Sequence, residues 1–210
     1  MLEYTRTKAN EFGITLYSGT EYNLPQFIEI KDQDVMGLAN TKFVMIDFVR
    51  TRLQTSLDII TRNIYNRGVF PICAHPERIF HRISEVRTIF DYEFSLQLTA
   101  SSIIGGFGNL CQKYSLELID CGLCHYIASD AHNQRRTFNM KKCKEFMLNK
   151  YGRETTSIIF DQNPELLLQG KPPLEYEAPN PNLDDGFLSH HPLIKFFMKQ
   201  FFPHRFDNED

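Results

Sequence analysis

Apolar and polar positions along residues 1–170 alternate between a strand-like period and a helix-like period. Short apolar runs, typical of buried strands, are separated by stretches whose apolar residues recur three or four positions apart. The clearest helical stretch begins at Leu53 and runs until Gly68 stops it. The other predicted helices are residues 82–92, 109–121 and 138–150. The predicted strands are residues 14–17, 43–48, 69–75, 95–100 and 124–130.

Five strands that alternate with helices predict an α/β fold with a parallel sheet, either doubly wound or closed as a barrel. Pro71 lies in the third predicted strand, where its missing N–H favours a strand start or an edge position. In parallel α/β sheets, the residues that bind ligands lie at the carboxyl ends of the strands. Functional side chains are therefore expected at those ends.

Side chains of metal-binding types stand at or just past the ends of four predicted strands. Any one of them could instead be a helix N-cap, but the set occurs in apolar surroundings such as VMIDF and YIASDAH. A buried carboxylate without a partner is costly, so it needs a proton, a cation or a metal ion. The sequence therefore predicts a metal site. Its candidate ligands are Glu21, Asp47, His75, Asp130 and His132.

The composition is that of a folded protein rather than a disordered or fibrous one. The 210 residues are 42% hydrophobic and 23% charged, and the formal net charge is −3. This balance excludes the broad cationic surface that non-specific nucleic-acid binding requires, so no nucleic-acid partner is expected. The sequence has neither a run of about 18 apolar residues nor a signal-peptide pattern at its start, which predicts a cytoplasmic protein that does not span a membrane.

Cysteine usage argues against a disulfide framework, because five cysteines are an odd number and no secretion signal accompanies them. The pair Cys121 and Cys124 has the spacing of redox or zinc motifs. A single pair of this kind is weak evidence, and ordinary buried thiols are the preferred interpretation.

The composition changes after residue 170, so the predicted domain covers residues 1–170. Residues 171–186 are rich in proline and predict an extended linker. Residues 187–210 are rich in phenylalanine and basic residues and end in acidic ones. This tail is expected either to fold back on the domain as an amphipathic helix or to contact a membrane surface or a partner.

The motifs of residues 1–170 resemble one family, the PHP-superfamily protein-tyrosine phosphatases of bacterial capsule and exopolysaccharide gene clusters. They occur in the order seen in that family, and the combination is specific although no single motif is. They are Gly19-Thr-Glu21, Ile46-Asp47-Phe48, Ala74-His75-Pro-Glu-Arg78, Gln97-Leu-Thr-Ala-Ser-Ser102, Gly105-Gly-Phe-Gly108, Ile127-Ala-Ser-Asp130-Ala-His132-Asn133 and Asp161-Gln-Asn-Pro-Glu-Leu-Leu.

The resemblance implies a distorted (β/α) barrel with a multinuclear Mn²⁺ centre, for which iron, zinc or magnesium could also serve. It also implies hydrolysis of phosphotyrosine on a bacterial tyrosine kinase, which would regulate capsular or exopolysaccharide synthesis. The implied ligands are the five residues named above, with Glu21 as the metal-bridging glutamate. Asp47 stands where the family usually carries Glu, so its reach is shorter by about 1.5 Å, one methylene. Arg78 and Arg136 match the arginines that hold the phosphate, with Arg135 as an alternative to the latter.

One feature of the family is absent from the sequence. The family opens with a strand that carries His-x-His, whereas the first histidine here is His75. On this basis we expect a chain that lacks the first strands of the barrel, about 60–70 residues. Such a chain is expected to have weak or no activity, and its exposed sheet edges could lead to homo-oligomers.

The sequence also bears on other phosphatase mechanisms and functions. A thiol phosphatase needs Cys-x5-Arg, but Cys73 and Arg78 are one residue too close, so the cysteine mechanism is excluded. The segment 101–108 lacks the signature of a nucleotide-binding loop and is interpreted as a loop that shapes the rim of the site. Hydrolysis of histidinol phosphate on the same scaffold, or kinase binding without turnover, remain as alternatives.

Overall fold

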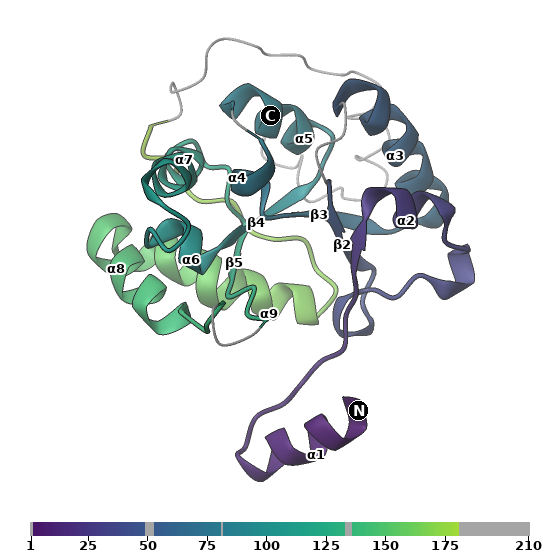
Figure 1. The fold of residues 1–210 in the computed structure, drawn as a ribbon, viewed down its shortest axis with the longest axis horizontal. Coiled ribbons are helices and arrows are strands. Elements are labelled where there is room, and N and C mark those ends of the chain that lie inside the picture. The colour runs from purple at the N-terminus through teal and green to yellow at the C-terminus, as the bar shows by residue number, and fades with distance from the viewer. Residues whose placement is uncertain (1, 49–52, 81, 133–135, 181–210) are drawn as a thin grey trace, which may run out of the picture.

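Five parallel strands form one sheet in the computed structural model, which describes residues 2–48, 53–80, 82–132 and 136–180 (Figure 1). The strand order in the sheet, β1-β2-β3-β4-β5, follows the order in the chain. The strands are β1 (Glu21–Asn23), β2 (Phe43–Asp47), β3 (Phe70–Ala74), β4 (Ser95–Thr99) and β5 (Tyr126–Ala128). This arrangement confirms the predicted α/β fold with a parallel sheet.

The strand order favours the winding of a barrel over the doubly wound sheet, the two alternatives that the sequence left open. A doubly wound sheet reverses its strand order at a switch point, but this sheet does not reverse. Right-handed crossovers that always step in the same direction place their helices on the same face of the sheet, as in a barrel. Figure 1 shows α2, α3, α5 and α7 following one another around the outside of the strands.

Each of the four predicted helices is present, with bounds that differ by one or two residues, except that the last of them ends at Ser157 instead of residue 150. Helices that the sequence did not predict lie at the amino terminus and directly after β1, β3 and β4. The helices are α1 (Leu2–Glu11), α2 (Leu24–Glu29), α3 (Leu53–Arg67), α4 (Pro76–Ile79), α5 (Ile83–Asp91), α6 (Ala100–Ile103), α7 (Asn109–Asp120), α8 (Met140–Ser157) and α9 (Asn163–Leu168). Two 3₁₀ turns (Asp32–Asp34 and Leu38–Asn40) and a π turn (Ile158–Gln162) complete the described elements.

The prediction of a strand at residues 14–17 is wrong. That segment is extended but joins no sheet, and the first strand begins at Glu21. The side chains of Ile14 and Tyr17 are exposed, so the apolar pattern of the segment does not face a core. The segment links α1 to the rest of the protein, and α1 stands away from the layered body (Figure 1).

Pro71 occupies the second position of β3, which is a central strand rather than an edge strand. It lies opposite Val44 of β2, close to the amino end of β3. The expectation of a strand start is therefore nearly met, because the proline falls one residue inside the strand.

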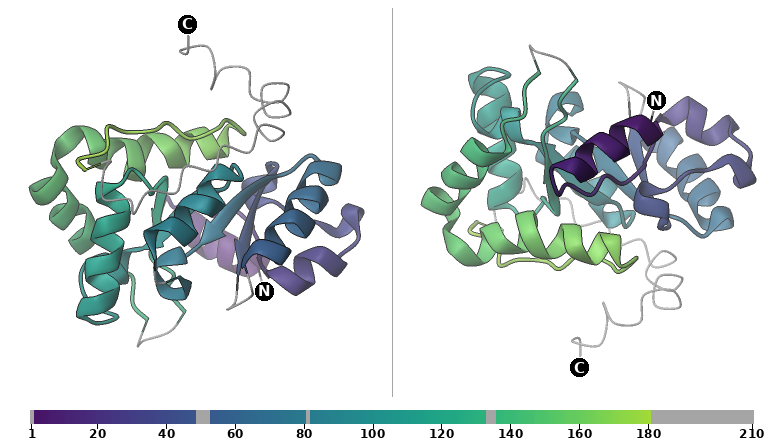
Figure 2. Two further views of the ribbon diagram at one scale, coloured as in Figure 1. Left: turned by 90° about the horizontal axis from the view of Figure 1, so that it is seen from above. Right: turned by 90° about the horizontal axis from the view of Figure 1, so that it is seen from below.

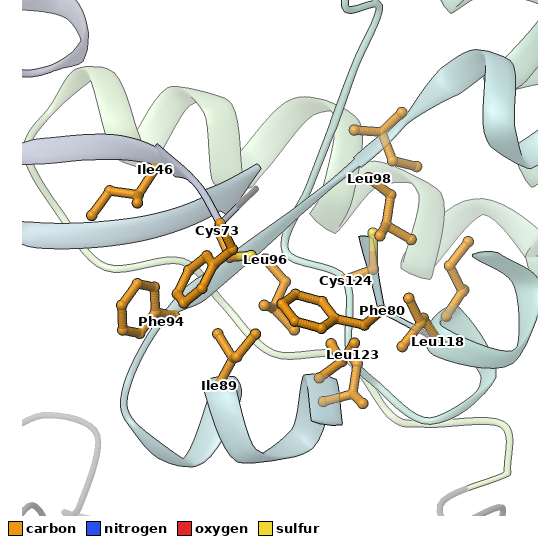
Figure 3. Packing of buried hydrophobic residues seen from close by; sticks show 14 of the residues in the cluster. Ile46, Cys73, Phe80, Ile89, Phe94, Leu96, Leu98, Leu118, Leu123 and Cys124 are labelled. Carbon is orange, nitrogen blue, oxygen red and sulfur yellow. The ribbon is translucent and has the colours of Figure 1, made fainter. Parts of the chain in front are cut away.

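The core between the sheet and the helices is apolar and rich in phenylalanine. The ring of Phe48 meets those of Phe80 and Phe94 at centroid distances of 5.9 and 5.4 Å. Cys73 and Cys124 lie among these side chains (Figure 3), and burial raises the pKa of both thiols well above its ordinary value. The cysteines are free and most are buried, which confirms their interpretation as ordinary core thiols.

Residues 171–180, the described part of the predicted linker, run alongside α8 and α9 (Figure 2). The backbone of Leu174 exchanges two hydrogen bonds with the side chain of Asn163, and the Tyr176 hydroxyl donates to the carbonyl of Ile119. This part of the segment is therefore fixed to the domain. The predicted boundary at residue 186 and the tail at 187–210 lie outside the described residues. Within the described part of the chain, no helix combines the length and apolarity needed to cross a bilayer.

Arg67 at the end of α3 connects that helix to α2. Its side chain is only 7% exposed and forms an ion pair of 2.8 Å with Asp32. The guanidinium donates to the carbonyls of Phe27 and Ile30, and it lies 4.9 Å from the centre of the Phe27 ring. One side chain thus satisfies backbone groups at the end of α2 that helix geometry leaves without partners.

We predict that Arg67→Ala lowers the free energy of unfolding by about 2–4 kcal/mol, because buried hydrogen bonds to a charged donor are lost and the carbonyls keep no substitute. Urea unfolding followed by circular dichroism measures this difference. Arg62→Ala is the matched control, since Arg62 is exposed on the same helix. Equal effects of the two substitutions would contradict the role given to Arg67.

Candidate metal and phosphate site

Three of the five predicted metal ligands meet at one edge of the sheet. The Nε2 atom of His75 lies 3.1 Å from Oε1 of Glu21 and 3.9 Å from Oδ2 of Asp47. One ligand atom from each residue can be chosen so that all three lie within 4.8 Å of one another. The three side chains therefore form a group that could hold a cation.

The strand register explains why these side chains meet. Glu21 pairs with Met45 of β2, and Asn23 pairs with Asp47. Side chains two positions apart on a strand point to the same face, so Glu21 and Asp47 share one face of neighbouring strands. The expectation that Glu21 follows the end of a strand is wrong, because Glu21 begins β1 and reaches the edge through its longer side chain.

His75 follows β3 in a strained backbone conformation that directs its ring toward the two carboxylates. Its φ of 35° and ψ of 52° lie in the left-handed region, which non-glycine residues seldom adopt. Its N–H donates to the carbonyl of Gln97 (2.8 Å), and its carbonyl accepts from the N–H of Arg78 (3.0 Å). Strain of this kind persists only where the surrounding structure imposes it, and it is concentrated at functional sites.

The donor set of this group fits a divalent cation. Two carboxylates and one imidazole suit manganese, iron or zinc, and magnesium in part. The His75 ring is 9% exposed, and its Nδ1 atom is buried with no hydrogen-bond partner among the described residues. The ring is thus held by packing and its backbone, with Nε2 presented to the carboxylates.

Asp130 and His132, the other two predicted ligands, lie beside the predicted phosphate-binding arginines. An oxygen of Asp130 is 2.8 Å from the guanidinium of Arg78 and also forms an ion pair with Arg136. His132 Nδ1 lies 3.5 Å from the other oxygen. Among the described residues, the three-ligand group does not include Asp130 or His132. The structure places Arg136 here, while Arg135, its alternative, lies outside the described residues.

Two guanidinium groups surround the Asp130 carboxylate in a site that exposes only 8% of its side chain. A buried carboxylate between two arginines is compensated without a metal ion. Its backbone φ of 49° is again in the left-handed region, as at His75. The turn after β5 therefore turns the carboxylate back toward Arg78 on α4.

The two groups of side chains are close enough to influence each other. The hydrogen bond with His75 lowers the pKa of Glu21, and burial opposes this effect. Coulombic interactions with His75, Arg78 and His132 lower the same pKa further. An anionic group of cation ligands thus lies beside a cationic group suited to phosphate.

Glu77 is a residue of this region that the sequence analysis missed. It is buried in the first turn of α4, and its Oε1 accepts from the Thr99 N–H (3.1 Å) and from the Ser102 hydroxyl (2.7 Å). It therefore fixes α4, which carries Arg78, to the end of β4. Its position between His75-Pro76 and Arg78 in the sequence was the available signal.

Comparison with known proteins identifies the family of the chain. The sequence profile described as "Capsular polysaccharide synthesis, CpsB/CapC" matches residues 2–169. The chain belongs to the CpsB/CapC family. This membership confirms the resemblance found in the sequence.

Two relatives and one solved structure show how far the similarity of this CpsB/CapC family chain extends. CapC of Staphylococcus aureus is 32% identical over 77% of this chain and 66% of its own length. YwqE of Bacillus subtilis, a tyrosine-protein phosphatase, is 27% identical over 75% of this chain and 61% of its own length. The chain therefore spans slightly less than two thirds of these relatives.

The fold is similar to a structure from a crystallographic study of YwqE from Bacillus subtilis and CpsB from Streptococcus pneumoniae, described there as unique metal-dependent tyrosine phosphatases. The TM-score is 0.71 at 25% identity, and the match covers 85% of this chain and 74% of that one. The parallel α/β fold is thus the fold of this family.

We predict that this CpsB/CapC family chain binds Mn²⁺ and that His75→Ala and Glu21→Gln each weaken binding at least about tenfold, because the first removes a ligand atom and the second removes the negative charge of a ligand. Isothermal titration calorimetry of the metal-stripped protein measures the affinity. Asp161→Asn is the control, since Asp161 is an exposed carboxylate that pairs with Lys144 instead. Unchanged affinity in both site variants would show that the three side chains do not form the metal site.

A second prediction concerns pH and Glu77. Burial raises the pKa of Glu77, although the hydrogen bonds from Ser102 and Thr99 act in the opposite direction. As the pH rises from the ordinary pKa toward the raised one, the unfolded chain loses the proton first and the fold loses stability. Glu77→Gln cannot ionise, so its Tm should rise relative to that of wild type as the pH increases above 4.5.

Thermal unfolding of both proteins across this pH range measures the difference. The exposed Glu165 on α9 provides the control, and Glu165→Gln should keep the pH profile of the wild type. A Tm difference between Glu77→Gln and wild type that stays constant with pH would contradict the assignment.

Proposed function

We propose that this chain carries the metal and phosphate sites of a metal-dependent protein-tyrosine phosphatase. Its substrate would be phosphotyrosine on a bacterial tyrosine kinase, and its role would be the regulation of capsular or exopolysaccharide synthesis. The observation that carries the proposal is the adjacency of the cation-ligand group of Glu21, Asp47 and His75 to the arginine pair around Asp130. Membership in the CpsB/CapC family and the names of its phosphatase relatives support the same reaction.

Phosphate monoesters need a nucleophile at neutral pH and neutralisation of the phosphoryl oxygens. Bound divalent cations supply a water of lowered pKa and part of that neutralisation. Glu21, Asp47 and His75 would hold such a cation, and Mn²⁺ is the proposed ion, with iron, zinc or magnesium as alternatives. Ligation by Asp130 and His132 stays a prediction, because Asp130 is engaged by two arginines in this structure.

The arginines would bind the substrate through its phosphate. Arg78 and Arg136 present forked N–H donors, which match two phosphate oxygens in a way that lysine cannot copy. Asp130 holds both guanidinium groups in place before a substrate arrives. Such preorganisation reduces the entropy that is lost when the phosphate binds.

A second candidate function is phosphotyrosine binding without turnover. It is favoured by the small number of cation ligands: the described residues form a group of three, and the sequence contains no His-x-His. In that case the chain would bind the kinase through the same arginines and release no phosphate.

The proposed reaction is tested with the purified 210-residue chain, stripped of metal and then supplied with Mn²⁺. We expect weak release of phosphate from a phosphotyrosine peptide, with less still from histidinol phosphate, and a loss of this activity on chelation. Arg78→Lys should lower kcat/KM by about 10- to 100-fold because the forked donor is lost, whereas Arg62→Lys on the surface of α3 should not.

The outcomes separate the candidates. A preference for histidinol phosphate, or turnover that ignores chelation, would overturn the proposed reaction. Tight binding of the phosphotyrosine peptide without phosphate release in Mn²⁺ would establish the second candidate instead.

A further inference from the structure

Phe107 is a large apolar side chain displayed next to the proposed phosphate site. It lies on the loop between α6 and α7 and is 41% exposed. The guanidinium carbon of Arg78 is 5.4 Å from the centre of its ring. The aromatic ring thus adjoins the same arginine that pairs with Asp130.

The backbone of this loop fixes the position of the ring. Gly105 and Gly108 have φ values of 83° and 91°, which residues with a side chain seldom adopt. The N–H of Gly106 donates to the carbonyl of Ser101 (2.7 Å), and a Cβ on Gly106 would lie 3.0 Å from that oxygen. The glycines therefore let the loop close tightly against α6, with Phe107 at its exposed turn.

A second exposed phenylalanine lies on a segment tied to the same loop. Phe138 is 74% exposed, and the side chain of the next residue, Asn139, donates to the hydroxyl of Ser101 at 2.9 Å. Ser101 in turn accepts from Gly106 of the glycine loop. This region of the surface is thus aromatic beside a cationic centre, an arrangement that suits a ligand with both an anion and a ring.

We propose that Phe107 packs against the aromatic ring of the substrate and thereby selects aryl over alkyl phosphate esters. The inference rests on the proposed function, in which Arg78 binds the phosphate. In an aryl phosphate, only the ester oxygen separates the ring from phosphorus, so a ring bound through its phosphate at Arg78 lies close to Phe107. Two aromatic rings in contact gain stability beyond the area they bury, whereas the alkyl carbon of a phosphoserine offers no such partner.

Phe107 could instead serve only to cover Arg78, as a structural cation–π partner. Removing it would then affect every phosphate ester equally, because the arginine contacts the phosphate and not the leaving group. The ratio of kcat/KM for aryl and alkyl esters therefore distinguishes a specificity residue from a structural one.

The experiment uses the full 210-residue chain with Mn²⁺ and two peptides that differ only in phosphotyrosine or phosphoserine. Phe107→Ala should lower the phosphotyrosine to phosphoserine ratio by roughly 3- to 10-fold, mainly through KM, as expected for the loss of one aromatic contact. Phe107→Tyr should keep the wild-type ratio, since tyrosine retains an aromatic ring. Phe12→Ala is the matched control, because Phe12 is 78% exposed on the turn after α1.

Calorimetric binding of phosphotyrosine and of inorganic phosphate gives a readout that does not depend on turnover. Phe107→Ala should weaken phosphotyrosine binding and leave phosphate binding unchanged. Equal losses for both ligands, or an unchanged ratio, would overturn the inference and leave the proposed function standing. Wild-type protein that neither binds nor hydrolyses phosphotyrosine would overturn both.

Discussion

Two carboxylates, Glu21 and Asp47, lie on one face of neighbouring parallel strands, and the rest of the site depends on how their repulsion is offset. The strand register imposes this arrangement, because Glu21 pairs with Met45, which lies two positions before Asp47 on β2. The imidazole of His75 hydrogen-bonds to Glu21, and positive charges from the neighbouring group add to this effect. A bound cation would neutralise both carboxylates more fully, so the fold itself favours cation binding at this position.

The second group of side chains, around Asp130, has the opposite arrangement of charges, because positive side chains surround one carboxylate. Asp130 is compensated by two arginines, which leaves the region around it positively charged. A phosphate ester needs both environments at once, a cation at its reacting oxygens and forked donors at the others. Glu77 connects the two arrangements mechanically, because it fixes α4, which lies directly after His75 and carries Arg78, to β4 and α6.

The sequence predicted those parts of the fold that depend on local apolar patterns. Strands β2 to β5 and the longer helices follow from periodicity, since their apolar faces are buried in the core. The segment 14–17 has the same pattern but an exposed surface, and a pattern alone cannot tell which neighbours will cover it. Strand β1 consists of Glu21, Tyr22 and Asn23, so no apolar run marks it in the sequence.

The candidate site was predicted as a set of residue types, but not as two separate groups. Strand ends identified all five acidic and imidazole residues, and family motifs identified the arginines. Which of them pair depends on contacts between distant segments: Arg78 lies on α4, and Asp130 follows β5, more than 50 positions later. Such pairings depend on tertiary structure, and no local pattern encodes them.

The aspartate at position 47 shows how a small change in side-chain length shapes the site. The side chain of Asp47, one methylene shorter than a glutamate, stops 3.9 Å from Nε2 of His75, beyond hydrogen-bond distance. Glu21, starting from farther back on β1, reaches the same nitrogen at 3.1 Å and takes its hydrogen bond. Asp47 is thus left with a carboxylate oxygen directed at the group but not bonded to its imidazole. A divalent cation with ligands at about 2.1–2.2 Å would replace the hydrogen bond between His75 and Glu21, because Nε2 and a carboxylate oxygen would both bind the ion.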